Sequence, residues 1–357
     1  MRLVRGFLIV CMLLLLALNV CAEEASGIEV SPQEGLPQEA AEQIGAYEDF
    51  SADGFSGTLL RLLGDAVSLL GGSWKEGLSC CGMILAAVLL CGLTDTSEHT
   101  FGLSAPVGAL AITAICTGSL HSMLQLGTQT VEKIDTYFVL LLPGIASLTA
   151  ASGMTAASSA LYLGTLFFLK LLMSVIRCFL VPGIYLYAML SAAEAALENE
   201  KLSKLRELIY WLISGTLKLT LYLFTGYLTV TGVIAGSVDA VRLKAAKLAL
   251  SGTVPVVGGI ISDASEALLT SAVTIKGAVG AYGLLAVLAL CLYPFLRVAV
   301  QHLLMKGTTA LSGLIGKKCH VSLVEHLTSA MGLIVGMVGT YSIMVLICIT
   351  IFLKIAV

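Results

Sequence analysis

Charge is scarce in this sequence. Only 12% of its 357 residues are charged, 57% are hydrophobic, and the mean hydropathy is +0.96. A soluble domain carries roughly 25% charged residues, so a soluble protein of this size would not cover its surface with so few. The net charge of −3 also gives no basic field for nucleic acid. The composition argues against a soluble enzyme, a disordered chain or a DNA-binding domain, and it indicates a polytopic membrane protein.

Motifs for catalysis and for metal binding are also missing. The sequence has no GxSxG, no HExxH and no GxxxxGK[ST]. Its 10 cysteines form no CxxC and no Cys/His pair at zinc-ligand spacing, and most lie in apolar runs, where cysteine behaves as a small hydrophobe. His320 and His326 are six residues apart, whereas the zinc-binding helix motif places its histidines four apart. We therefore expect no enzymatic activity, no cofactor and no metal.

The first 22 residues have the pattern of a secretory signal peptide. Arg2 and Arg5 provide a basic start, Phe7–Leu18 is apolar, and small residues precede Glu23. The apolar stretch is short for a membrane span of about 20 residues, although a signal anchor is the alternative. We expect cleavage near Glu23.

Residues 23–77 form an acidic lead segment that we expect outside the cytoplasm. Between Glu23 and Gly57 lie nine of the 23 acidic residues and no Lys or Arg. Low hydrophobicity and charge of one sign predict a flexible or weakly helical tail. The alternative is a docking peptide for a partner.

Residues 78–357 are expected to form an all-α, polytopic transmembrane domain with six to eight transmembrane helices. The apolar runs are Leu78–Leu93, Phe101–Leu126, Thr136–Ala151, Ala156–Ile176, Phe179–Leu197, Leu208–Ala235, Gly277–Val300 and Met331–Leu353. Pro143 and Pro182, each followed by glycine, predict kinks or breaks. Gly232/Gly236 and Gly332/Gly336 have GxxxG spacing, which favours close helix packing within or between chains.

The positive-inside rule gives a mixed answer on topology. With the lead segment outside and eight spans, Glu198–Glu207 and Arg297–Lys318 fall inside with several basic residues, as expected. Ser237–Thr274 then falls outside although it carries basic residues, which fits less well. An odd number of spans reverses some of these loops.

Residues 236–275 differ from the spans on either side. Asp239–Leu250 is amphipathic, Gly252–Gly259 is rich in turn residues, and Ser262 or Asp263 has the spacing of a helix cap. The segment is expected to be either an amphipathic hairpin at the membrane interface or a re-entrant element lining a passage.

Four charged residues lie within apolar runs: Lys170, Arg177, Glu194 and Lys218. A charge at the bilayer centre costs about 2.5–3.5 kcal/mol on insertion scales, so such residues mark functional positions. Snorkelling to the headgroups accounts for the first three, whereas Lys218 is deeper in its run. Lys170 and Arg177 are seven apart and share a helical face. The candidate functional or assembly positions are Lys218, Asp239, Lys244, Lys247, Pro255, Gly258 and Asp263.

The segment Gly236–Lys247, followed by Val254–Gly259 and Ser262-Asp263-Ala264, resembles stage III sporulation protein AE of endospore-forming bacteria. Leu141-Leu142-Pro143 before the small-residue run Ala150–Ala160, and Tyr293–Arg297, are similar to it as well. The resemblance covers roughly Thr136 to the C-terminus.

That resemblance implies a subunit of a channel or secretion-like complex between mother cell and forespore, acting as pore or scaffold. The expected location is the mother-cell membrane around the forespore (the outer forespore membrane). The expected partners are the other stage III proteins of the AA to AH series, including the AA ATPase, with a forespore-side protein reached through the ring proteins, and membrane lipid. The complex is needed for late forespore gene expression. No nucleic acid is expected as a partner. A secondary transporter or permease is the alternative.

Overall fold

The structure is a computed structural model that describes residues 64, 74–75, 77–92, 104–151, 155–197, 200–253 and 258–354. The signal peptide and most of the lead segment lie outside this part of the chain. The labelled helices are α4 (Ser104–Ala151), α5 (Thr155–Val175), the π-helix η1 (Ile176–Leu180), α6 (Val181–Leu197), α7 (Glu200–Thr253), α8 (Gly258–Ile315) and α9 (Lys318–Lys354). The predicted all-α class is confirmed.

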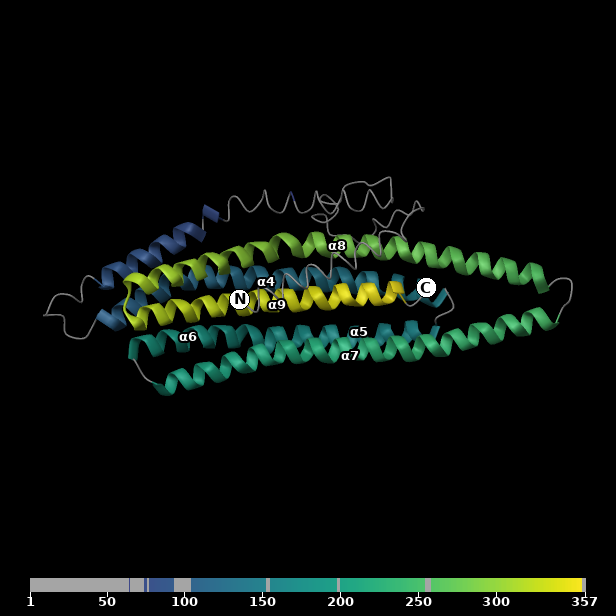
Figure 1. Ribbon diagram of the computed structural model, residues 1–357, viewed down its shortest axis with the longest axis horizontal. Coiled ribbons are helices and arrows are strands. Elements are labelled where there is room, and N and C mark those ends of the chain that lie inside the picture. Colours follow the sequence, from purple (N-terminus) through teal and green to yellow (C-terminus); the bar gives the residue numbers. More distant parts are fainter. Residues whose placement is uncertain are drawn as a thin grey trace.

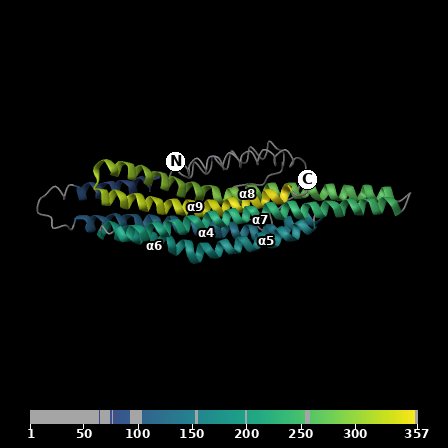
Figure 2. The same cartoon turned by 60° about the horizontal axis from the view of Figure 1, so that its bottom comes forward.

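The helices lie side by side along one long axis (Figure 1). α5, η1 and α6 form one continuous stretch, and this stretch, α4, α7, α8 and α9 alternate in direction along the chain (Figure 1). α6 meets α7, and α8 meets α9, at one end of the bundle, which we call the loop end. At the other end α7 and α8 project past the remaining helices as a hairpin in both views (Figures 1 and 2). We call Asp239–Thr253 of α7 and Gly258–Lys276 of α8 the hairpin tip.

Within the described residues, five helical stretches are long and apolar enough to cross a membrane. They are Pro106–Ser147, Ser158–Leu197, Lys201–Thr231, Leu285–Ile315 and Lys318–Phe352, and a shorter apolar helix covers Gly77–Gly92. Two pairs of the expected runs have merged. Phe101–Leu126 and Thr136–Ala151 both belong to α4, and the next two runs form one helical stretch through α5, η1 and α6. The merging accounts for five long spans where the sequence shows more runs.

The two prolines that predicted kinks or breaks have different outcomes. α4 continues as an α-helix through Pro143. Pro182 lies just after the π-helix η1. The N–H of Val181 donates a hydrogen bond to the carbonyl of Ile176, and this bond closes the last turn of η1. Proline has no N–H and is tolerated in the first turn of a helix, so Pro182 fits the start of α6. The irregularity expected at this position is therefore a π-turn, with no break in the helical path.

α9 is the central helix of the bundle. It packs against α4, α6, α7 and α8, and 56% of its most apolar stretch is buried, compared with 22–39% for the other four spans. Its side chains Tyr341, Met337 and Phe352 are fully buried. Gly332 and Gly336 let neighbours approach closely, since a Cβ there would lie 3.1 Å from His302 and 3.7 Å from Leu217. This GxxxG pair therefore serves packing within one chain.

The hairpin differs in one respect from the expected arrangement. Asp239–Leu250 is helical, as its amphipathic pattern predicts, but it simply continues α7. α8 already begins at Gly258, so Ser262 and Asp263 lie inside the helix and do not cap it. The expected cap at these residues is wrong. Local capping patterns are weak signals, and here the apolar sequence Gly258-Gly259-Ile260-Ile261 joins the helix ahead of them.

Substitution of Gly164 by alanine tests how tightly α5 and α7 pack. A Cβ at Gly164 would collide with the Tyr227 ring, whose hydroxyl donates to the Ala160 carbonyl at 2.7 Å. We expect Gly164→Ala to lower the free energy of unfolding by about 1–3 kcal/mol through overpacking. Unfolding by denaturing detergent, followed by circular dichroism, measures this change.

Gly226→Ala on α7 is the matched control, because nothing lies within 4 Å of a Cβ there. That variant should be neutral or slightly stabilising, since alanine is the better helix former. Equal loss of stability in both variants would contradict the described packing.

Candidate functional site

One face of α4 is polar although the helix is among the candidate membrane spans. Its exposed side chains are His121, Gln125, Gln129, Glu132 and Thr136, which are three or four residues apart and therefore lie on one side of the helix. We call these five residues the polar face. Lipid tails offer no partners for such groups, so this side of α4 is suited to water or to another protein.

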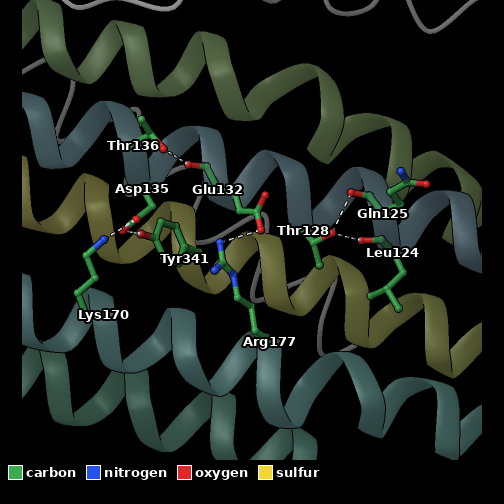
Figure 3. A network of polar contacts seen from close by, with 9 residues as sticks. All are labelled: Leu124, Gln125, Thr128, Glu132, Asp135, Thr136, Lys170, Arg177 and Tyr341. Atoms are coloured by element: carbon green, nitrogen blue, oxygen red, sulfur yellow. Dashed lines mark hydrogen bonds and ion pairs between the residues drawn. The ribbon is translucent and has the colours of Figure 1, made fainter.

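Asp135, next to the polar face, is buried and joins three helices (Figure 3). One carboxylate oxygen accepts a hydrogen bond from Lys170 Nζ of α5 at 2.8 Å. The other accepts one from the Tyr341 hydroxyl of α9 at 2.7 Å. A buried carboxylate is costly unless it is paired and hydrogen-bonded, and both conditions are met here.

Glu132, one turn earlier on α4, forms a second ion pair. Its Oε1 accepts a hydrogen bond from Arg177 of η1 at 2.9 Å (Figure 3). Both side chains are open to the surroundings, at 61% exposure for Arg177 and 46% for Glu132. An exposed pair contributes little stability, so a role in contact with water or a partner explains it better than a structural one. The pair also lies at a π-helix, an irregularity that is frequent at functional sites.

His121 extends the contacts between α4 and the following helical stretch. Its Nδ1 lies 2.6 Å from the hydroxyl of Tyr185 on α6. The polar face is thus bordered along its length by Tyr185, Arg177 and Lys170, and each of these side chains reaches a residue of α4.

A second polar cluster lies near the loop end. Arg206 of α7 is buried, donates from Nε to Glu194 of α6 at 2.6 Å, and lies over the Tyr187 ring at 6.0 Å from its centroid. This pair closes α6 onto α7, and its burial indicates a structural role. Snorkelling therefore does not describe Glu194, which is paired inside the bundle.

The structure does not bring the sequence-derived candidates together. Lys218 is exposed on α7, and none of the described residues forms an ion pair with it. Asp239, Lys244 and Lys247 belong to α7 in the hairpin tip, more than 20 residues further on, so they lie about 30–45 Å away. Gly258 and Asp263 belong to α8 there. Pro255 lies outside the described residues.

The sequence reasoning missed Glu132 and Asp135, the partners of the two charges that it did find. It treated residues 127–135 as a connection between two spans. The signal was present, because Val131, Ile134 and Phe138 are apolar, are spaced as on one helical face, and are fully buried.

Little in the described region resembles catalytic or metal chemistry. No group of three or more His, Cys, Asp or Glu side chains there could hold a metal. Ser322 Oγ lies 2.9 Å from His326 Nε2, but both residues lie inside α9, beyond its first turn. Backbone N–H groups in a helix interior are already bonded, so they cannot form an oxyanion hole beside this serine. The expectation of no enzymatic activity stays a prediction.

The two ion pairs of α4 should differ in their effect on stability. Asp135→Ala leaves the buried Tyr341 hydroxyl without its acceptor, so we expect a loss of about 1–3 kcal/mol. Glu132→Ala removes an exposed pair and should cost about 0–1 kcal/mol. Detergent unfolding of both variants measures the difference, and equal losses would contradict a structural role for Asp135.

Comparison with known proteins places the chain in a family. The family model described as Stage III sporulation protein AE (spore_III_AE) matches residues 55–356. Stage III sporulation protein AE of Bacillus subtilis (strain 168) is 22% identical over 223 residues, which are 61% of this chain and 56% of that protein. The match thus spans little more than half of the relative's length, and no solved structure matches. The chain belongs to the stage III sporulation protein AE family, a sporulation family, and its apolar helices make it a multi-pass membrane protein.

Proposed function

We propose that this chain is a membrane subunit of a channel or secretion-like complex that links the mother cell and the forespore. It would reside in the mother-cell membrane around the forespore and support late forespore gene expression. Family membership supports the sporulation role. The polar face of α4 supports the channel role, because it gives a membrane bundle an outward surface suited to water or to polar partners.

The position of the polar face decides what kind of subunit this would be. The centre of the bundle is filled by the buried side chains of α9, including Tyr341 and Phe352. A passage through the middle of one subunit would have to displace them. A passage that this chain lines would therefore run along the outside of α4, between this subunit and its neighbours.

The alternative of a secondary transporter fits the structure less well. Such transporters bind their substrates at half-helices that end near the bilayer midplane. Here α4 continues through Pro143, and the path from α5 to α6 continues through η1. Continuous helices favour a subunit that contributes a fixed surface to an assembly.

The hairpin tip is the second surface that we assign to the assembly. It extends beyond the other helices, so it is accessible from several sides (Figures 1 and 2). It holds five of the positions singled out in the sequence: Asp239, Lys244, Lys247, Gly258 and Asp263. Partners of the AA to AH series, including the AA ATPase, are proposed to contact the complex through such projecting elements.

Thiol modification can test whether the polar face is used. In a variant without native cysteines, Gln125→Cys places a thiol on the polar face, and Leu163→Cys on α5 places one on an apolar surface that is 66% exposed. We expect a membrane-permeant maleimide to lower the expression of a late forespore reporter at least several-fold for Gln125→Cys, relative to the cysteine-free parent treated in the same way, because the added group blocks the surface. Leu163→Cys should be unaffected. A modified Gln125→Cys protein that supports normal reporter expression would contradict the proposal.

Substitutions next to the hairpin tip test the assembly surface separately. Gly258→Val changes the first residue of α8, and Pro255→Ala changes a residue that lies in the sequence between the end of α7 at Thr253 and the start of α8. We expect spore yield to fall while the amount of protein in the membrane stays normal, because the bundle does not depend on the tip. Heat-resistant spore counts and immunoblots of membranes provide the two readouts. Normal spore yield in both variants would remove the tip from the contact surface.

A further inference from the structure

Exposed basic side chains gather at one level of the bundle. Lys170 of α5 is 58% exposed, Arg177 of η1 is 61% exposed, and Lys218 of α7 is also exposed. We call these three residues the basic girdle. Their helices are neighbours in the bundle, since α7 packs against both α5 and α6.

Two contacts between the helices fix the level of Lys218. On one side of it Ile213 lies against Gly183, and on the other side Phe224 packs edge-on against Phe168. On α7, Lys218 is about midway between Ile213 and Phe224. On the facing helical stretch, the midpoint between Phe168 and Gly183 is next to Arg177, so Lys218 and Arg177 lie at about the same level. Lys170 is seven residues from Arg177, about 10 Å along the helix. A lysine side chain can extend over much of that distance.

Beyond the girdle, toward the hairpin tip, the helices carry no charged residue for a long distance. The stretches without Asp, Glu, Lys or Arg are 136–151 of α4, 155–169 of α5, 219–238 of α7, 277–296 of α8 and 341–353 of α9. The α7 and α8 stretches have 20 residues each. At 1.5 Å per residue they are about 30 Å long, which is the thickness of the hydrocarbon core.

Charged residues also mark the far end of these stretches. Asp239 follows on α7, Lys276 precedes on α8, and Lys354 ends α9. α4 ends and α5 begins near the same level, at the side where the C-terminus lies (Figure 1). Charges thus bound the apolar section on both sides in α7 and α8.

Toward the loop end the charge-free stretches of α7 and α8 are short. Residues 104–131 of α4, 178–193 of η1 and α6, and 326–340 of α9 also lack Asp, Glu, Lys and Arg, but the α4 stretch carries most of the polar face and α9 is the central, largely buried helix. On α7 only residues 208–217 separate Glu207 from Lys218, about 15 Å. On α8 only residues 298–305 separate Arg297 from Lys306, about 12 Å. Both distances are at most about half of the hydrocarbon thickness. The polar face, from His121 to Glu132, also lies on this side of Asp135.

We propose that the basic girdle binds lipid phosphates at one headgroup level, and that the hydrocarbon covers the bundle only from the girdle to the base of the hairpin tip. Ammonium and guanidinium groups at the edge of the apolar section reach phosphate by snorkelling. The half of the bundle at the loop end then lies outside the hydrocarbon and forms a helical domain of its own. This placement also removes the cost of presenting the polar face to lipid tails.

Cysteine labelling in proteoliposomes tests the position of the bilayer. The full chain, without native cysteines, is reconstituted in phosphatidylethanolamine and phosphatidylglycerol vesicles with a hydrophilic maleimide on both faces of the membrane. Leu163→Cys lies within the proposed hydrocarbon section and Met189→Cys outside it, and both native side chains are highly exposed, at 66% and 68%. We expect Met189→Cys to react and Leu163→Cys to be protected at least tenfold. The proposal would be overturned if Leu163→Cys reacted and Met189→Cys was protected, if both variants reacted equally, or if both were protected.

A second measurement tests the phosphate contact itself. Phosphatidylglycerol retained by the purified protein in detergent is quantified by mass spectrometry for wild type, Lys218→Gln and the control Lys204→Gln near the loop end. Loss of one girdle charge should lower retention about fivefold, as expected for one basic residue at an anionic surface. Lys204→Gln should retain the wild-type amount.

Two outcomes of that measurement would count against the girdle. Equal effects of Lys218→Gln and Lys204→Gln would show a general charge effect. Displacement of the lipid by inorganic phosphate alone would identify a free-phosphate site in place of a headgroup level. Neither measurement reads out channel activity, so a failure of the girdle can be told apart from a failure of the channel proposal.

Discussion

The carboxylate of Asp135 constrains the arrangement of the whole bundle. It is buried where α4, α5 and α9 meet, and it accepts hydrogen bonds from Lys170 and Tyr341, one from each neighbouring helix. If any of the three helices slid by one turn, a buried charge or hydroxyl would lose its partner. The register set here also brings Glu132 opposite Arg177, so the exposed pair on the surface depends on the buried one beneath it.

Much of the architecture is predictable from composition and hydropathy, and the errors have physical causes. Scarce charge and long apolar runs lead directly to a helical membrane bundle. The division of α4 into two runs fails because a helix that is polar on one face lowers the local hydropathy without ending. In that segment Val131, Ile134 and Phe138 continue the buried face while Glu132 and Thr136 face outward.

The sequence indicated only two of the four charged residues of this site, for a related reason. Lys170 and Arg177 stand out because their own runs are strongly apolar. Asp135 and Glu132 do not stand out, because their neighbours Lys133 and Gln129 are also polar. Pairing across helices depends on tertiary register, which local patterns do not contain. The cap assigned to Ser262 or Asp263 shows the same limit, since α8 begins earlier at Gly258.

The loop-end half of the bundle has an unusually apolar surface. Met189 is 68% exposed, Leu197 70% and Leu314 82%. Large exposed apolar surfaces mark sites of protein association. If the membrane occupies the section proposed here, these leucines and methionines would be the surface on which other subunits assemble.

The uninterrupted course of α7 has a mechanical consequence. Its 54 residues extend about 81 Å, from the loop end to the turn of the hairpin tip. A hydrogen-bonded helix resists bending, and no proline occurs along α7. A tilt imposed at one end, such as a pull on the tip by a motor protein, would therefore be transmitted as a lever movement to the opposite end, across the full thickness of a bilayer.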